Sequence, residues 1–288
     1  MNLRTFSILD QAIKIKKILD SADAIVVGVG SGLTSADGNN YYGSKFSDNF
    51  KDFIEKYHFL DMLQLCFMIL DHEKYTELFI VDLQKLIFLD LKESESFLNL
   101  KKILENKNFF IITTNSDSFF EKSGFDNQKI FYIQGKYNLM QSLKKCVKNF
   151  LYQDDELILK MVQNQKNMKV DYNLLPKCPE CNAFLEINKR ISFKGMVEDQ
   201  NFDNQKANYN NFIEQNKDKN LVFLEIGVGF TTRNWLNCHF KRWQKKFKNA
   251  KYLVINQKKY RTNKDILEKS YFFHEDIKLL LQKITEQE

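Results

Sequence analysis

Residues 24–38, AIVVGVGSGLTSADG, decide the fold. The apolar run at 24–30 predicts a buried strand that leads into a glycine-rich turn. The chain has only ten Gly, and five of them lie between 28 and 43, where the backbone needs positive φ or a close approach to a ligand. A strand followed by glycines and a helix start gathers backbone N–H groups at one point, which suits a pyrophosphate. Tight turns need glycine in any case, so this turn alone leaves nucleotide binding open.

Four later apolar runs repeat the pattern. They are NFFIITTN at 108–115, KIFYIQG at 129–135, LVFLEIGVG at 221–229 and KYLVINQ at 251–257. Strands that are apolar on both faces and alternate with helical segments favour a parallel sheet covered on both sides. We therefore predict an α/β fold with a Rossmann-like parallel sheet, a helical insertion and a small CxxC module. The expected boundaries are 1–43, 106–139 and 215–288 for the Rossmann-like domain, 44–105 for the insertion and 140–214 for the module.

Polar residues follow these strands where each one ends. Doubly wound sheets bind ligands at the carboxyl ends of their strands, so these residues form a candidate site. They are Thr34, Asn115, Asp117, Gln134, Thr231 and Asn256. A second strand and glycine turn, EIGVGFTT at 225–232, strengthens the case, because packing alone hardly explains two such turns about two hundred residues apart. Asn115 would also suit a helix cap and Asp117 a surface charge.

Composition excludes several classes of protein. The chain has 288 residues, 43% of them hydrophobic, and no run approaches the roughly 18 apolar residues of a membrane helix. The N-terminal residues lack the apolar stretch and cleavage site of a signal peptide, so we expect a cytoplasmic protein. The net charge of +6 comes mainly from scattered Lys, and the densest basic patch, at 239–251, is typical of a solvated helix face. We expect neither a membrane nor a nucleic acid as partner.

The ordered set of motifs resembles the sirtuins, and most of all their macrodomain-linked bacterial branch, class M. The matching pieces are GSGLTSADG (30–38), TTNSD (113–117), SGF (123–125), IQG (133–135), CPEC (178–181), EIGVGFTT (225–232) and VINQ (254–257). Together they span about residues 20–280. Each motif alone is weak evidence, whereas the ordered set is specific.

The resemblance implies NAD as cofactor. It assigns NAD contacts to the first glycine loop, to the second glycine turn and to the end of the last strand, with Asn256 at the adenine ribose. The residues are Gly30, Ser31, Gly32, Thr34, Gly38, Tyr41, Gly227, Gly229, Thr231 and Asn256. It also implies catalytic roles for Asn115 and Asp117, beside the nicotinamide and its ribose, and for Gln134.

Two departures from the sirtuin pattern argue against deacylation. Deacylating sirtuins have a Pro-Asp-Phe-Arg element after the glycine loop and a His-Gly at the third strand, where this chain has NNYYGSKF (39–46) and Gln134-Gly135. An imidazole can take a proton from a ribose hydroxyl near neutral pH, and the amide of Gln134 cannot. The four His, at 58, 72, 239 and 274, lie outside the expected site segments.

Class M sirtuins show the same substitution. The resemblance therefore implies ADP-ribosyl transfer from NAD to a lipoylated carrier similar to glycine-cleavage H protein, with a macrodomain hydrolase as a further partner. In this scheme Asn115 and Asp117 stabilise an oxocarbenium-like centre as nicotinamide leaves, and Gln134 orients the acceptor. NAD hydrolysis by the same pocket, and a non-enzymatic NAD-binding sensor, are the alternatives.

The cysteines leave the metal question open. Cys178 and Cys181 form a CxxC, and Cys146 lies upstream, while Cys66 and Cys238 stand in apolar helical surroundings typical of a core. In the related proteins a second pair precedes the CxxC, and Ser142 occupies the place of its first member. A structural zinc site uses four ligands, so the module either holds zinc with an incomplete cysteine set or is held together by packing.

Overall fold

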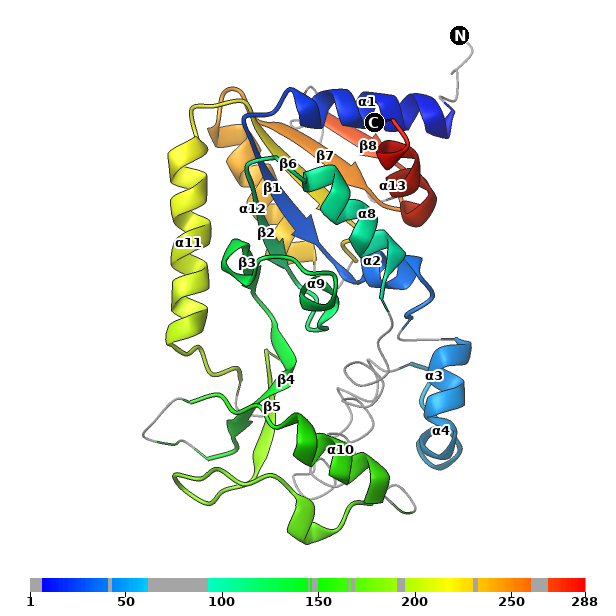
Figure 1. Cartoon of the computed structure of the whole chain (residues 1–288), viewed down its shortest axis with the longest axis vertical. Helices are drawn as coiled ribbons and strands as arrows, with labels where there is room; N and C mark the ends of the chain where they lie inside the picture. The colour runs from blue at the N-terminus through cyan, green and yellow to red at the C-terminus, as the bar shows by residue number, and fades with distance from the viewer. Residues whose placement is uncertain are drawn as a thin grey trace.

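The structure is a computed structural model. It describes residues 7–40, 43–61, 93–144, 146, 150–164, 166, 169–190, 195–229, 233–259 and 269–287. Figure 1 shows a large body that contains a twisted sheet, and a smaller body that contains the antiparallel strands β4 and β5 and the helix α10. The candidate site residues Tyr41 and Thr231 lie outside the described residues, as do positions 62–92 of the expected helical insertion.

A parallel sheet forms the larger body. Among the described residues it has six strands in the order β3-β2-β1-β6-β7-β8, and every neighbouring pair is parallel. The strands are β1 (Ala24–Val29), β2 (Phe109–Thr113), β3 (Ile130–Tyr132), β6 (Leu221–Ile226), β7 (Lys251–Ile255) and β8 (Ser270–Phe273). The Rossmann-like α/β fold expected from the apolar runs is confirmed. Chain order reverses beside β1, which places the crevice of such folds at the carboxyl ends of β1 and β6.

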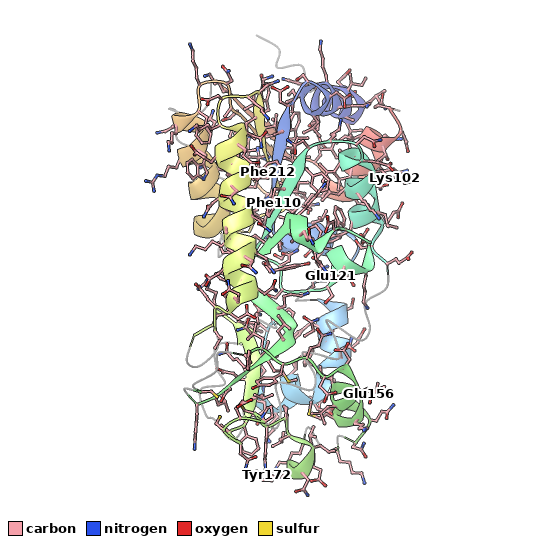
Figure 2. All side chains as sticks on the ribbon, turned by 60° about the vertical axis from the view of Figure 1, so that its left-hand side comes forward. Lys102, Phe110, Glu121, Glu156, Tyr172 and Phe212 are labelled. Carbon is pink, nitrogen blue, oxygen red and sulfur yellow. The ribbon has the colours of Figure 1, made fainter. Side chains whose placement is uncertain are left out.

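Helices cover both faces of this sheet because alternate residues of each strand point to opposite sides. One face packs on α1 (Ile8–Asp20), α8 (Glu95–Leu104), α9 (Phe119–Lys122) and α13 (Ile277–Thr285). The other packs on α11 (Gln200–Asn216) and α12 (Arg233–Lys246). On that second face Phe212 of α11 meets Phe110 of β2 with ring centroids 5.7 Å apart (Figure 2). Both faces are therefore dry, which explains why the strands are apolar without alternation.

Shorter helices complete the described structure. They are α2 (Ser31–Ala36), α3 (Ser44–Asn49), α4 (Lys51–Tyr57), α10 (Asp155–Asn164) and the 3-10 turns Asn127–Lys129 and Tyr172–Leu174. The smaller body contains an antiparallel pair, β4 (Gly135–Ser142) with β5 (Leu185–Lys189). No described helix is both long enough and apolar enough to cross a membrane.

The sequence reading missed or left open several elements, among them α11, β8 and both strands of the smaller body. The Asn-rich run near 200–212, whose composition suited disorder as well as order, forms most of α11, with Asp199 as its N-cap. Its buried Phe202, Tyr209 and Ile213 recur at helical spacing, a signal that its polar composition hides. The short edge strand β8 and the strand β4 were not foreseen, because β8 is only half-buried and β4 begins at Gly135, after a turn of only two residues that follows β3.

Candidate active site

The two glycine loops lie in backbone contact with each other. The N–H of Gly32 donates to the carbonyl of Gly227 at 2.8 Å, and the N–H of Gly30 donates to Ile226 at 3.0 Å. A Cβ at Gly32 would lie 2.6 Å from the Cα of Gly227, a distance at which the two atoms would clash. Gly227 also has a φ of +62°, which L side chains rarely adopt. These backbone N–H groups therefore hydrogen-bond the first loop to the second. The sequence had predicted that they bind a phosphate.

A cavity of about 380 Å³ opens beside this crossing, at the carboxyl ends of β1, β6 and β7. It brings together five of the residues expected to bind NAD, and these are Ser31, Gly32, Gly227, Gly229 and Asn256. Its size falls in the range of small-molecule sites. The side chain of Asn256 is buried and links the cavity walls, since its Nδ2 donates to the Val228 carbonyl at 2.9 Å and its Oδ1 accepts from the Lys258 N–H at 3.1 Å.

Three buried polar side chains, from α2 and from the segment that follows β2, are linked by hydrogen bonds. Asn115 Nδ2 donates to Thr34 Oγ1 at 3.0 Å, and Thr34 Oγ1 donates to Asp117 Oδ2 at 2.8 Å. Asn115 Nδ2 also reaches the Gly30 carbonyl at 3.3 Å. The structure thus brings together four residues that the sequence reading placed in one site. Asp117 is 1% exposed and is therefore not a surface charge, and Asn115 does not cap a helix, because its amide bonds to Thr34 and to the Gly30 carbonyl.

The Asn115 side chain has one atom without a hydrogen-bond partner. Asn115 Oδ1 is fully buried and no described group donates a hydrogen bond to it. Buried polar atoms are nearly always paired, so an orphaned acceptor next to the glycine loop indicates a donor that a ligand or water supplies. A ribose hydroxyl is such a donor. The residues present therefore fit NAD: glycines line a cavity, and an unpaired amide oxygen lies on a side chain that bonds to Gly30 of the same glycine loop.

Burial raises the pKa of Asp117 to about 6, from an ordinary value of 3.8. The loss of hydration is the largest cause, and the charge of Glu121 adds to it. Hydrogen bonds from Thr34 and from the Phe119 N–H, and the charge of Lys136, oppose the shift. The carboxylate is thus ionised at neutral pH and carries a negative charge in a dry site, where such a charge acts most strongly on a ligand.

We expect Asp117→Asn to remove a pH dependence of stability. Because the pKa of Asp117 is raised on folding, its stabilising contribution is fully present below about pH 3.8 and is lost as pH rises through about 6. This loss amounts to about 3 kcal/mol. Urea unfolding at pH 4 and pH 8 measures it: the free energy of unfolding of the variant, relative to the unmodified protein, should rise by about 2–3 kcal/mol between the two pH values. The exposed Asp218→Asn is the control, and an equal change there would contradict the assignment.

Gln134 lies in the turn between β3 and β4, held beside the end of β2. The N–H of Ile133 donates to the Thr113 carbonyl at 3.2 Å, and the N–H of Tyr137 donates to Ser116 at 2.9 Å. The carbonyl of Gln134 accepts from the Arg190 N–H at 3.3 Å. These bonds fix the backbone of the turn on both sides of Gln134 and place this residue next to the segment that carries Asn115 and Asp117.

Two charged residues of the site were missed. Lys136 forms an ion pair with Glu121, and its ammonium lies 4.7 Å from the ring centroid of Tyr132. The charge of Glu121 raises the pKa of Asp117, and the charge of Lys136 lowers it. The sequence offers little signal for this pair, because the two residues stand 15 positions apart on different elements. Gly38, expected to bind NAD, follows α2 with a φ of +80° and does not line the cavity.

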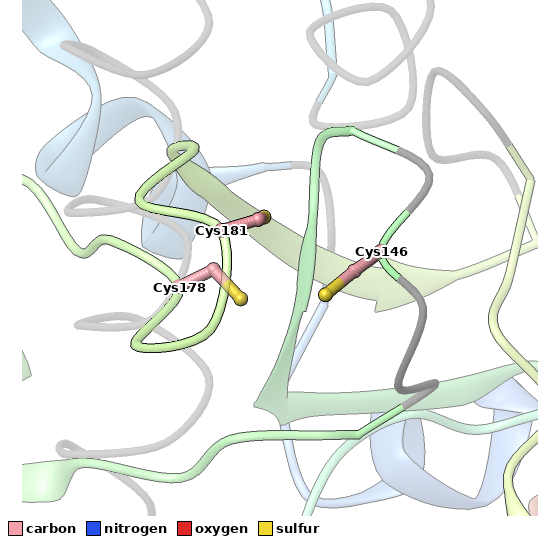
Figure 3. A group of neighbouring side chains, drawn as sticks. All are labelled: Cys146, Cys178 and Cys181. Carbon is pink, nitrogen blue, oxygen red and sulfur yellow. The ribbon is translucent and has the colours of Figure 1, made fainter.

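The three cysteine side chains of the small module lie close together. The thiols of Cys146, Cys178 and Cys181 lie within 4.8 Å of one another, and Figure 3 shows the sulfurs of Cys146 and Cys178 pointing toward each other. Ser142 Oγ lies 3.2 Å from Cys181 Sγ, and Tyr152 Oη lies 3.4 Å from Cys178 Sγ. The thiol donors suit zinc, so this cluster could hold a zinc ion.

Comparison with known proteins identifies relatives across most of the chain, although no family model matches. A protein of Staphylococcus aureus named "Protein ADP-ribosyltransferase" is 40% identical over 273 residues, which cover 94% of this chain and 86% of that protein. A Fusarium oxysporum protein named "Probable bifunctional ADP-ribose hydrolase/ADP-ribosyltransferase" is 26% identical over 74% of this chain, which spans 37% of that protein. Solved sirtuin structures share the fold. One, a Sir2 mutant with p53 peptide and NAD, has a TM-score of 0.60 at 16% identity and covers 96% of this chain and 98% of that one.

Proposed function

Because the chain belongs to the protein ADP-ribosyltransferases of sirtuin type, we propose that it transfers ADP-ribose from NAD to a lipoylated carrier similar to glycine-cleavage H protein. NAD-dependent ADP-ribosyl transfer itself follows from the family. The orphaned Asn115 Oδ1 beside the glycine-lined cavity is the observation in this chain that best supports it. The choice of carrier rests on the resemblance to class M sirtuins.

We propose that the charges and amides of the site act on the ribose end of NAD. Bound NAD supplies a ribosyl carbon from which nicotinamide leaves. Asp117, ionised above about pH 6, stabilises the positive charge that develops near that carbon. Asn115 accepts a hydrogen bond from a ribose hydroxyl, and Thr34 holds both side chains in place through its own hydroxyl. The glycine loops and Asn256 hold the remainder of the nucleotide.

Gln134 has the role of orienting the acceptor. Its amide can donate and accept hydrogen bonds but cannot take up a proton, so the acceptor side chain must reach the site in a form that needs no strong base. Deacylation by the sirtuin route needs that base, which supports transfer as the reaction. Water can act as a competing acceptor in the same pocket, and NAD hydrolysis is then a side reaction.

A macrodomain-type hydrolase is the proposed functional partner. One relative is named as combining ADP-ribose hydrolase with ADP-ribosyltransferase, and this chain spans only 37% of that relative. A separate hydrolase that removes ADP-ribose from the same acceptor would give this chain the corresponding pairing. We also propose that the protein belongs to the class M branch and is located in the cytoplasm. For the small module we propose a structural zinc ion on Cys146, Cys178 and Cys181, an incomplete set of cysteine ligands.

The test is incubation with NAD labelled in its adenylate phosphate. Three arms contain the lipoylated carrier, the same carrier without lipoate, and no carrier. We expect label on the lipoylated carrier at a rate at least tenfold above the other two arms, read by gel and by mass spectrometry. Equal labelling of both carrier forms would contradict the dependence on lipoate. Free ADP-ribose without labelled protein would instead assign hydrolysis to the pocket.

A further inference from the structure

A second cavity lies on the opposite face of the sheet from α8 and α13, between α11 and α12. Its volume is about 640 Å³, which falls in the range of small-molecule sites. Ile112 of β2, Phe131 of β3 and Ile133 supply an apolar floor, and Phe202 and Trp243 supply aromatic walls. It shares no lining residue with the cavity beside the glycine loops, so it is a separate site.

Cations from both helices border this cavity. Lys206 comes from α11, and Arg242 and Lys246 stand one turn apart on α12, so that the two helices present positive charge across the opening. Within the described part of the chain, neither Lys206 nor Arg242 has an acidic group within 4.0 Å. The remaining charges of the lining, Arg190 and Glu198, pair with each other at 2.6 Å. The cavity therefore offers net positive charge above an apolar floor.

Tyr209 adds a donor to the lining. Its side chain is 6% exposed, and its ring packs against Phe110 and Phe131 with centroids 5.9 and 6.0 Å away. Its hydroxyl oxygen is buried, and no described group accepts a hydrogen bond from its O–H; the neighbouring Trp243 indole can only donate to that oxygen. Burial raises the pKa of Tyr209 well above its ordinary value, although the Trp243 side chain opposes the shift, so the hydroxyl keeps its proton. A buried O–H without an acceptor is costly unless a ligand supplies one.

We propose that this cavity binds a small amphipathic carboxylate, with its hydrocarbon body on the floor formed by Ile112, Phe131 and Ile133 and its carboxylate among Lys206, Arg242 and Tyr209. The apolar floor requires an apolar body, since a fully polar anion would leave it unfilled. The cations and the unpaired hydroxyl require an acceptor, and a carboxylate accepts from several donors at once. The proposal is independent of the transfer reaction, because the two cavities are separate.

Decanoate is the probe for this site. The chain has two Trp, so Trp235→Phe makes Trp243 the single reporter of the cavity. We expect decanoate to cause saturable quenching or a spectral shift of Trp243 fluorescence. The dissociation constant should be at least tenfold higher for decanol and for decyltrimethylammonium than for decanoate. Equal affinity for decanol and decanoate would overturn the assignment of an anion. No binding of decanoate, together with binding of an acidic amphipathic peptide, would replace the small molecule with a protein partner.

Matched variants locate the binding. Arg242→Glu should weaken decanoate at least tenfold, whereas Lys245→Glu, with the same charge change at an exposed position of α12 outside the cavity, should change it less than twofold. Tyr209→Phe should weaken decanoate binding about threefold, while its urea unfolding midpoint should stay close to that of the Lys245→Glu control. Equal losses in Arg242→Glu and Lys245→Glu would show general charge attraction and would overturn the site.

Discussion

Asn115→Ala is expected to lower the rate of ADP-ribosyl transfer by about 10²–10³-fold while NAD affinity falls less than tenfold. The estimate follows from the loss of a preorganised polar group where charge develops, which typically has this effect on turnover. In the structure the Asn115 amide is held by Thr34 and by the Gly30 carbonyl, so its free oxygen is fixed in direction before any ligand arrives. An interaction realised mainly in the transition state changes turnover before affinity.

Two variants control for this experiment. Asn99→Ala removes another buried Asn with an unpaired amide atom, in α8, and should leave turnover within twofold. Asn115→Asp keeps the oxygen acceptor but loses the donor to Thr34, and should retain more activity than Asn115→Ala if the oxygen contacts the ribose. Single-turnover rates and calorimetric NAD binding separate the two effects. Equal losses of binding and turnover in Asn115→Ala would assign the residue a structural role.

The sequence predicted the sheet because its strands are buried on both faces. The strands at 24–29, 109–113, 221–226 and 251–255 are mostly apolar and almost wholly buried, and the shorter strand at 130–132 is a buried apolar run as well. The edge strand β8 escaped prediction because water reaches one side of it. The helix α11 was left open because one buried stripe among many Asn and Gln is a weak signal.

The site was predictable as a set of residues but not as a network. Strand ends located Asn115 and Asp117, since the carboxyl ends of parallel strands meet at one edge. Nothing in the spacing showed that Thr34, more than eighty positions earlier, would bond to both. Likewise, the influence of Glu121 and Lys136 on Asp117 depends on side chains from separate elements. Contacts of this kind arise from tertiary packing, which local sequence does not encode.

The sequence identified Gly32 as an essential glycine of the first loop but explained only part of why glycine is needed there. From the sequence, Gly32 is needed so that a phosphate can approach the backbone. In the structure its N–H and its Cα face Gly227, and an added Cβ would lie 2.6 Å from that residue's Cα and 2.7 Å from its carbonyl oxygen. The first steric demand on Gly32 is thus the crossing of the two loops, on which the shape of the cavity depends.

Gly32→Val is accordingly expected to destabilise the fold by about 3 kcal/mol or more and to weaken NAD binding at least 100-fold. Both clashing atoms of Gly227 belong to the backbone, so no rotamer change relieves them, and the loops must separate. Urea unfolding and NAD calorimetry measure the two effects. Gly229→Ala is the matched control, because Gly229 lines the same cavity and a Cβ there meets nothing within 4 Å. Its free energy of unfolding should stay within about 1 kcal/mol of the unmodified protein. If Gly32→Val keeps full stability and loses only NAD affinity, the phosphate explanation is sufficient and the loop crossing is not the constraint.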